Sequence, residues 1–399
     1  MRCLWWKDSE KAGGGSSYDQ HPMTIPQLSN DPGQQALYTL IQRSIANAGG
    51  WLGFDRFMAL ALYAPGMGYY TNSLRKFGLT PETGSDFATA PEMSKHFGRT
   101  LAHQVAEALQ VTGTDEVWEF GAGSGALALQ LLDRLGDSVK RYTIVDLSGS
   151  LRERQQETLK AHAHKVQWVD ALPEQLSGVV VGNEVLDAMP VQLLVRKGGV
   201  WHERGVVWGT DAASPLQWED RVTDLRPPME VPGEHDYLTE IHHQAEAFVA
   251  TLADRFKAGE AATGKGGAAF LIDYGFPESE YFHPQRSMGT LMCHKLHKSD
   301  HDPLVDVGGK DITAHVNFTG VALAAQDAGL SVLGYTSQAH FLINCGLLPP
   351  LVDAPLDEKT MAQKLITEHE MGELFKVVAF GTTEWEPMGF AQGDRTYAL

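Results

Sequence analysis

The sequence has little cysteine, little positive charge and no long apolar run, and each shortage excludes a class of protein. Its three cysteines, Cys3, Cys293 and Cys345, are odd in number and widely separated, which is typical of a reducing compartment rather than a disulfide framework. The formal net charge of −18 argues against broad binding to a nucleic-acid backbone, which requires a cationic surface. A basic protein or peptide remains compatible with this charge as a partner.

No segment reaches the length of a membrane span without charges or turn residues, so no membrane insertion is expected. The first residues contain no apolar signal core, and Asp8 and Glu10 are atypical of an organelle transit peptide. Residues 1–33, which contain glycine, serine and several prolines, predict a flexible N-terminal tail. The expected location is therefore the cytoplasm.

The bulk composition describes a soluble globular enzyme, with 43% hydrophobic and 21% charged residues over 399 positions. Residues 34–112 predict a helical N-terminal region and lid, with helical patterns at 34–63 and 93–109. Residues 113–399 predict an α/β core, because strand and helix patterns alternate and favour a mostly parallel sheet with helices on both faces. A helix is expected at 236–257, and strands are expected at 115–120, 141–146, 165–169, 177–183, 268–274, 330–336 and 375–382.

Two segments interrupt the predicted core. Residues from about 191 to 235 predict a hairpin that turns at 197–199, followed by a polar, proline-rich loop. Residues 275–314 are too long and irregular for a simple connection, so we interpret them as a functional insertion or cap.

The most informative motif is a glycine-rich turn between an apolar strand and a helical pattern. Its glycines allow a sharp turn and a close approach of the backbone to a ligand. The spacing also satisfies the dinucleotide-binding pattern, so the motif alone predicts an adenosine-containing cofactor without saying which one. A turn required only for strand–helix packing is the alternative. The residues expected to form the cradle are Glu119, Gly121, Ala122, Gly123, Ser124 and Gly125.

An acidic residue follows each of the next two predicted strands. Asp146 lies 23 residues beyond Gly123, where an acid would meet the hydroxyl pair of a ribose. Its alternative role is a helix N-cap, which Ser148 could share. After the following strand come Asp170, Ala171 and Leu172, a polar residue followed by small and apolar ones, which suit the edge and ring of an adenine.

Residues 182–190 bring an amide and two acids, Asn183, Glu184 and Asp187, to the carboxyl edge of the predicted sheet, beside the cofactor crevice. Glu184 and Asp187 are three residues apart, so one helical turn would place them on the same side. We predict that these two acids are catalytic. The alternative is a capped, solvated turn, because acids are common at the start of a helix.

Three further segments are interpreted more briefly. Residues 84–94 suit a lid over the cofactor, with a helix lead-in capped by Thr89 or Ser94 as the alternative. Residues 259–265 resemble a phosphate-binding loop, but Gly266 replaces the required hydroxyl residue and the order of helix and strand is inverted. A histidine-rich stretch lacks the paired second half of a zinc site, so no metal is predicted for His283, Cys293, His294, His297 and His301.

Several longer motifs together are similar to one family. They are GYYTN (68–72), SDFATAPEMSKHFG (85–98), EFGAGSG (119–125), GNEVLDAMPV (182–191), IDYGF (272–276), YFHPQRSMGTLMCH (281–294), DITAHVNFTG (311–320) and GYTSQAHFLINCGLL (334–348). From about residue 34 to residue 382 the chain resembles the MidA-type class I S-adenosylmethionine-dependent methyltransferases, relatives of the mitochondrial complex I assembly arginine methyltransferase. It departs from the family pattern at Ser85, where glycine is usual, and at Asp146, where glutamate is common.

The resemblance implies a Rossmann-like, seven-stranded class I methyltransferase sheet with a helical N-terminal region and inserted segments, and S-adenosylmethionine as cofactor. By position, residues 121–125 would cradle the methionine part and Asp146 the ribose, while Asp170 and Ala171 would lie at the adenine. Asn183 and Glu184 would lie nearest the sulfonium. The expected cofactor-binding set is completed by Thr89, Pro91, Leu147 and Leu172.

The family's best-described activity is dimethylation of an arginine on a respiratory-complex subunit, which makes a protein substrate the expected partner. Two other interpretations stay open at the level of sequence. One is an NAD-dependent dehydrogenase, which the glycine spacing permits. The other is an assembly chaperone that binds a respiratory subunit and uses the cofactor only structurally.

Overall fold

The computed structural model describes residues 32–72, 89–146, 148–211 and 213–399. The chain divides into two compact units, which are described separately. The core unit comprises Thr89–Met189, His242–Tyr281 and His315–Leu399, and the smaller unit comprises Met1–Ala88, Pro190–Ile241 and Phe282–Ala314. The domain boundaries expected from the sequence remain a proposal.

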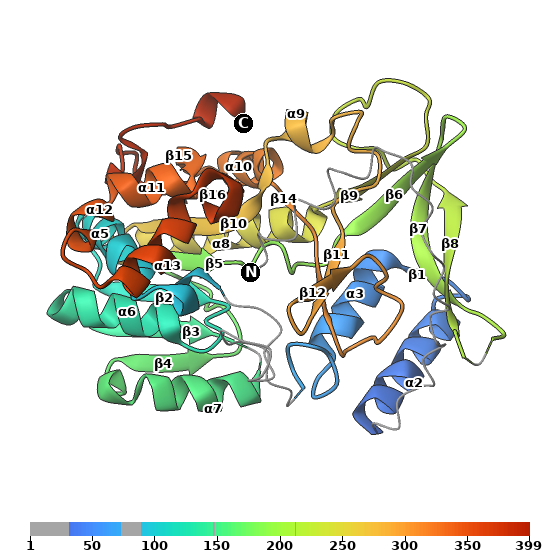
Figure 1. The fold of residues 1–399 in the computed structure, drawn as a ribbon, viewed down its shortest axis with the longest axis horizontal. Helices are drawn as coiled ribbons and strands as arrows, with labels where there is room; N and C mark the ends of the chain where they lie inside the picture. The colour runs from blue at the N-terminus through green and yellow to red at the C-terminus, as the bar shows by residue number, and fades with distance from the viewer. Residues whose placement is uncertain (1–31, 73–88, 147, 212) are drawn as a thin grey trace. The chain divides into compact units, whose positions relative to one another are not determined.

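The core unit is built on a mostly parallel sheet in the order β15-β16-β10-β5-β2-β3-β4, to which the short strand β14 adds beside β10 (Figure 1). Only β16 runs against its neighbours, β10 and β15. This order confirms the class I methyltransferase fold and all seven predicted strands. The bounds are β2 Glu116–Phe120, β3 Arg141–Val145, β4 Val166–Val169, β5 Gly178–Asn183, β10 Gly267–Phe276, β14 Val316–Asn317, β15 Ser331–Ser337 and β16 Phe375–Gly381.

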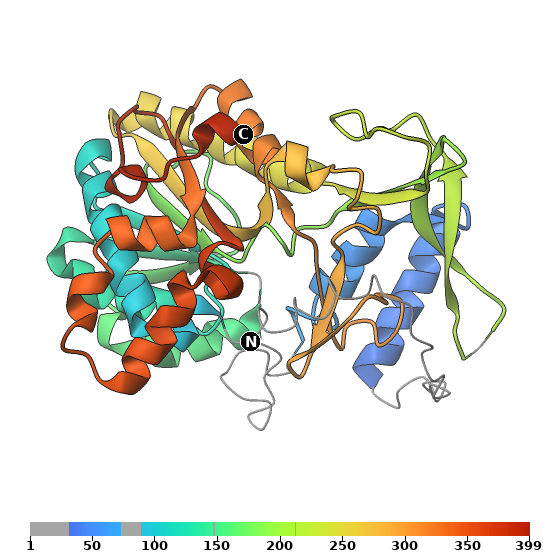
Figure 2. The same cartoon turned by 45° about the horizontal axis from the view of Figure 1, so that its top comes forward.

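Helices cover both faces of this sheet (Figures 1 and 2). On one face, Leu271 of β10 belongs to an apolar cluster with residues of α8 (His243–Thr263) and α10 (Phe318–Asp327). The neighbouring Phe270 points to the opposite face, where its ring lies 6.4 Å from that of Phe341 on α11. The central strand β5 is buried along its whole length, as expected for a parallel strand covered on both sides.

The remaining helices of the core unit begin and end where the local sequence favours it. Ser94 caps α5, because its hydroxyl accepts a hydrogen bond from the N–H of His96, and Gly113 ends the same helix in the left-handed conformation. The bounds are α4 Ala90–Met93, α5 Lys95–Thr112, α6 Ala126–Leu135, α7 Gly149–Thr158, α9 Glu278–Tyr281, α11 Gln338–Asn344, α12 Leu348–Leu351 and α13 Leu356–Ile366.

The smaller unit is built on an antiparallel sheet in the order β1-β7-β6-β9, with β8 paired to β7. The predicted hairpin is confirmed: β6 and β7 are joined at Gly198 and Gly199, whose φ angles of +54° and +79° suit a tight hairpin turn. The elements are α2 Pro32–Asn47, β1 Leu52–Gly53, α3 Phe54–Tyr63, β6 Gln192–Lys197, β7 Val200–Trp208, β8 Leu216–Val222 and β9 Tyr237–Ile241.

Three local predictions are wrong. The helix expected over 34–63 is two helices, because Gly49 and Gly50 break it with φ angles of +76° and +90°. The proline-rich loop after the hairpin contains strand β8, which pairs with β7 along its length. The helix expected from residue 236 begins at His243, because Tyr237–Ile241 pairs with β6 as strand β9. In the second and third cases, pairing with a distant strand outweighed the local pattern.

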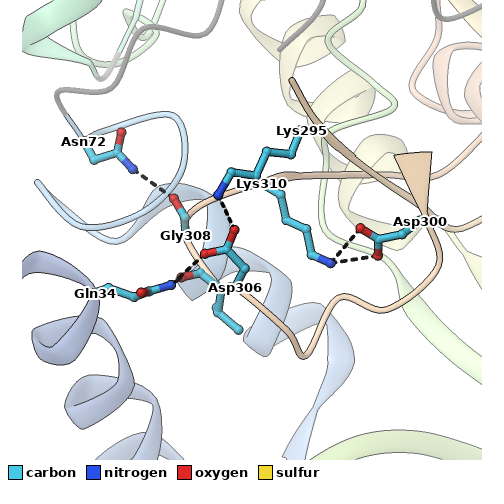
Figure 3. A network of polar contacts seen from close by, with 8 residues as sticks. Gln34, Asn72, Lys295, Asp300, Asp306, Gly308 and Lys310 are labelled. Carbon is cyan, nitrogen blue, oxygen red and sulfur yellow. Dashed lines mark hydrogen bonds and ion pairs between the residues drawn. The ribbon is translucent and has the colours of Figure 1, made fainter. Parts of the chain in front are cut away.

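Residues 282–314 contain a small sheet of β11 (Met292–Lys295), β12 (Lys298–Asp300) and β13 (Asp311–Thr313). A polar network ties its long connection to Gln34 on α2 and to Asn72 (Figure 3). Asp306 pairs with Lys295 and accepts a hydrogen bond from Gln34, the Gly308 carbonyl accepts one from Asn72, and Lys310 pairs with Asp300. These contacts explain how a segment with little regular structure is ordered within the smaller unit.

Candidate active site at the carboxyl edge of the sheet

The register of the core sheet brings the predicted site residues to one edge. Phe120 pairs with Val145, and Val145 pairs with Val169. On the other side, Phe120 pairs with Gly182, which pairs with Leu271. These residues form one row across five parallel strands. The next residue on each strand is therefore level with its neighbours, and these residues are Asp170, Asp146, Gly121, Asn183 and Ile272.

The glycine loop has the backbone conformation that its sequence predicts. Gly121, Gly123 and Gly125 have φ angles of +64°, +53° and +83°, which side chains rarely tolerate. A β-carbon added to Gly121 would also lie 3.0 Å from Cγ2 of Val185, so this glycine allows close contact between two loops of the edge. Ala122 is buried, and Ser124 is half-buried with its carbonyl accepting a hydrogen bond from Thr158.

Glu119 precedes this loop and is only 2% exposed. Its Oε2 accepts a hydrogen bond of 2.6 Å from the hydroxyl of Tyr142 on the adjacent strand. Burial raises the pKa of Glu119 to about 8; the hydrogen bond from Tyr142 opposes this rise, and the nearby Asp146 adds to it. The hydrogen bond from Tyr142 to Glu119 therefore joins β3 to β2 just before the glycine loop.

Asp146 is held by hydrogen bonds from two groups, the N–H of Ser148 at 2.8 Å and Nε2 of Gln155 at 2.7 Å. Burial raises the pKa of Asp146, and both hydrogen bonds oppose that rise. Ser148 in turn caps α7, so the predicted N-cap is present beside the acid. Asp170 is more exposed and pairs with Arg152, while Ala171 is exposed and Leu172 packs against the core.

The helix that braces this edge, α7, was not predicted from the sequence. Arg152, Gln155 and Thr158 recur every third residue on α7 and so share one face. Gln155 is fully buried and donates to both the Gly123 carbonyl at 3.1 Å and Asp146, while its Oε1 accepts from Trp168. Thr158 donates to the Ser124 carbonyl. The three-residue polar spacing was the only available signal, and it does not reveal which way the face points.

The predicted catalytic residues lie in a turn that follows β5. The helical turn expected to align Glu184 with Asp187 is absent, because residues 184–189 form an irregular turn. Glu184 has a φ angle of +56°, rare for a residue with a long side chain, and its Oε1 accepts a hydrogen bond from Asn183. Glu184 is half-buried at the edge, whereas Asp187 is 2% exposed.

This turn is held by a second residue whose role was not predicted from the sequence. Asp273 follows the row on β10, is 1% exposed, and accepts through Oδ2 from the N–H groups of Val185, Leu186 and Asp187 at 3.0, 2.8 and 3.2 Å. Burial raises the pKa of Asp273, and the neighbouring Asp187 and Glu184 add to the rise. Asp273 stands in the quoted IDYGF motif, but its register opposite the turn is visible only in the sheet.

The remaining predicted residues divide into two groups. Thr89 directly precedes α4, and its side chain makes no capping hydrogen bond. The carbonyl of the buried Pro91 accepts a hydrogen bond from Gln130 on α6. Leu147 and residues 84–88 of the expected lid lie outside the described residues. Among the residues that are described, no group of three or more His, Cys, Asp or Glu side chains could hold a metal ion.

The edge fits a nucleoside cofactor with an amino-acid tail. Three glycines with positive φ leave room for the ligand to approach the backbone. Asn183 is 8% exposed, and its Oδ1 is buried without a hydrogen-bond partner, so it can accept a hydrogen bond from a bound group. The buried Asp146 offers carboxylate lone pairs that can accept from ribose hydroxyls. The S-adenosylmethionine that the family resemblance implies would supply an activated methyl group, and these residues would hold and orient it.

Comparison with solved structures agrees with this fit. The fold is similar to that of a superfamily member from Burkholderia thailandensis solved with bound S-adenosyl-homocysteine, with a TM-score of 0.86 and 46% sequence identity over 94% of this chain and 100% of that one. A native crystal structure from the same organism gives a TM-score of 0.82 at 45% identity, over the same shares of the two chains.

Two curated relatives are named protein arginine methyltransferase NDUFAF7 homolog, mitochondrial. The Caenorhabditis elegans protein is 26% identical over 85% of this chain and 87% of its own length. The Drosophila melanogaster protein is 27% identical over 82% of this chain and 79% of its own length.

The cytoplasmic location expected from the sequence is contradicted by these relatives, whose names place them in mitochondria. The expectation rested on the first residues of the sequence, which lack an apolar signal core and include Asp8 and Glu10. Within the described part of the chain, none of the helices combines the length and apolarity that crossing a bilayer requires.

The model of a family described as "Putative S-adenosyl-L-methionine-dependent methyltransferase" matches residues 100–336. This range contains β2 with its glycine loop, the turn after β5, and β10 with Asp273. S-adenosylmethionine is therefore the cofactor, and the dehydrogenase interpretation is set aside. The chain belongs to this family of S-adenosylmethionine-dependent methyltransferases.

Proposed function

We propose that the enzyme transfers a methyl group from S-adenosylmethionine to the side chain of an arginine in a protein. The observation that carries the proposal is the position of Glu184. Its half-buried carboxylate directly follows Asn183, which is level with Gly121 of the glycine loop. The names of the curated relatives, protein arginine methyltransferases, support the same acceptor.

The chemistry of an arginine acceptor suits this edge. A guanidinium is charged at neutral pH and presents N–H groups in a planar fork, which a carboxylate can bind through two parallel hydrogen bonds. Glu184 would orient the fork, stabilise its positive charge and accept the proton that the attacking nitrogen loses. Asn183, level with Gly121 across the strands, would contact the amino-acid part of the cofactor.

The other assignments are kept as proposals. Asp146 would hold the ribose, Asp170 and Ala171 the adenine, and residues 121–125 the methionine part. The second carboxylate, Asp187, would act near the acceptor; because it is 2% exposed, we propose that it acts electrostatically from within the turn. Thr89, Pro91, Leu147 and Leu172 complete the proposed cofactor contacts.

The finer proposal is that the acceptor protein is a subunit of a respiratory complex, as the resemblance to MidA-type enzymes implies. The net charge of −18 is consistent with a basic acceptor segment around the arginine.

The test is methyl transfer from labelled S-adenosylmethionine to proteins of a mitochondrial extract, followed by mass spectrometry of the labelled peptides. We expect label on arginine, and we expect Glu184→Gln to lower turnover by about two orders of magnitude. Label found only on other residues would refute the arginine assignment. Stable capture of a protein without any transfer of label would favour the assembly chaperone instead.

A further inference from the structure

The turn that carries Glu184 is held by a single side chain from another strand. Asp273 lies 88, 87 and 86 residues along the chain from the three amides that it binds, those of Val185, Leu186 and Asp187. Its Oδ1 accepts from the N–H of Tyr274. Since both oxygens bind main-chain groups and the residue is 1% exposed, Asp273 is not placed to touch a substrate.

The turn needs such support. Glu184 has a left-handed φ of +56°, which is unfavourable for any residue other than glycine and persists only where the surroundings impose it. On one side its N–H donates to the Ile272 carbonyl at 2.9 Å. On the other side, the following three N–H groups converge on Oδ2 of Asp273. Backbone on both sides of Glu184 is therefore fixed by β10.

Convergent N–H groups form a concave site that favours an oxygen acceptor. The three amides belong to an irregular turn, and each donates a hydrogen bond to Oδ2 of Asp273. Without the Asp273 carboxyl group these three hydrogen bonds would be lost, and the turn would be free to move. Movement of the turn would carry the Glu184 side chain away from the edge.

We propose that Asp273 is a positioning residue for methyl transfer: by binding three consecutive amides, it holds Glu184 in the strained conformation in which its carboxylate faces the sulfonium and the acceptor. The proposal rests on the catalytic role given to Glu184 above. Asp273 on β10 would align the turn after β5, and Glu184 on that turn would take part in the reaction.

The first experiment needs neither a variant nor an acceptor. Amide hydrogen exchange of the unmodified protein should show protection at Val185, Leu186 and Asp187 of about a hundredfold or more over open loops, although the segment is neither helix nor strand. Exchange at the rate of an open loop would overturn the proposal, because Asp273 would then not hold these groups in solution.

The second experiment compares Asp273→Ala with Asp273→Asn, which keeps an acceptor oxygen. Calorimetry gives the affinities for S-adenosylmethionine and S-adenosyl-homocysteine, which differ in the sulfonium charge. We expect Asp273→Ala to leave S-adenosyl-homocysteine affinity within about threefold and to reduce the preference for the charged cofactor as much as Glu184→Gln does. Asp273→Asn should restore most of that preference. An unchanged preference in Asp273→Ala would refute the positioning role.

The third experiment is a double-mutant cycle in methyl transfer. Asp273→Ala should lower kcat by about tenfold or more, and Asp273→Ala with Glu184→Gln should be no slower than Glu184→Gln alone, because both act through one group. Fully additive losses would overturn the proposal.

Glu107→Gln is the matched control for this cycle. Glu107 also accepts a hydrogen bond from a backbone N–H, that of Met388, and its replacement should leave kcat unchanged. If the wild-type enzyme labels no protein, the proposed function fails, whereas the exchange and affinity results still test Asp273.

Discussion

The glycine loop at 121–125 and the turn at 184–189 lie at the same sheet edge and reach unusual backbone conformations in different ways. In the loop, positive φ angles fall on Gly121, Gly123 and Gly125, so no side chain opposes them. In the turn, the positive φ falls on Glu184, whose side chain is needed, and Asp273 holds the next three amides. A strained backbone position can carry a functional side chain when a residue elsewhere in the fold stabilises it.

The largest expected effect is on the pH dependence of stability and concerns Glu119, two residues before Gly121. Glu119 has its pKa raised to about 8, so between pH 4.5 and about 8 the folded protein keeps a proton that the unfolded chain has lost. Stability should therefore fall as pH rises through that window, by about 1.4 kcal/mol per pH unit and a few kcal/mol in total. Glu119→Gln should remove this contribution and make the slope shallower.

Urea unfolding of the cofactor-free protein at pH 5 and pH 8.5 measures the slope for wild type and variant. Glu116→Gln is the control, since this carboxylate is on the same strand but its side chain is 26% exposed and pairs with Arg141. Equal slopes in wild type and Glu119→Gln would show that Glu119 does not keep its proton.

The next effect breaks the contact between the two loops. Gly121→Val places a branched side chain at φ +64° and against Cγ2 of Val185. We expect cofactor affinity to fall by about a hundredfold, measured by calorimetry with S-adenosyl-homocysteine. Gly113→Val has a similar φ of +68° and open space around it, so it should cost stability while affinity is kept. Affinity retained in Gly121→Val would remove this glycine from the cradle.

The smallest effect concerns the brace from α7. Gln155→Leu removes the hydrogen bonds to the Gly123 carbonyl and Asp146 but leaves Glu184 untouched. Cofactor affinity should fall by about tenfold, whereas kcat at saturating cofactor should stay within about twofold. The control is Gln338→Leu, a fully buried glutamine that donates to the Leu365 carbonyl and should affect stability only. A loss of kcat in Gln155→Leu at saturating cofactor would show that the brace supports the catalytic turn as well.

The same comparison explains what the sequence could predict. The glycine loop follows from adjacent residues, since an apolar strand, glycine spacing and a helical pattern are all local. The seven core strands were predicted because each is a short apolar run with turn residues at its ends. Strand β9 was mistaken for the start of a helix, because its pairing with β6 lies outside any local window.

The turn illustrates the limit more sharply. Glu184 and Asp187 could be selected as acids after a strand, yet their shared helical turn does not form, because Glu184 has a φ angle of +56°, outside the right-handed helical region. Gln155 was missed for a similar reason: a glutamine in a polar helix gives no local sign that it is fully buried against the glycine loop.

The division of roles between the glycine loop and the turn is tested by measuring two properties of Glu184→Gln side by side, the affinity for S-adenosyl-homocysteine and the rate of methyl transfer to arginine. We expect affinity within about threefold of wild type and a transfer rate of about 1% or less, since the glycine loop binds the cofactor and the turn takes part in the reaction. Transfer at the wild-type rate would contradict the role of Glu184. Loss of cofactor binding would contradict the view that the glycine loop binds the cofactor independently of the Glu184 carboxylate.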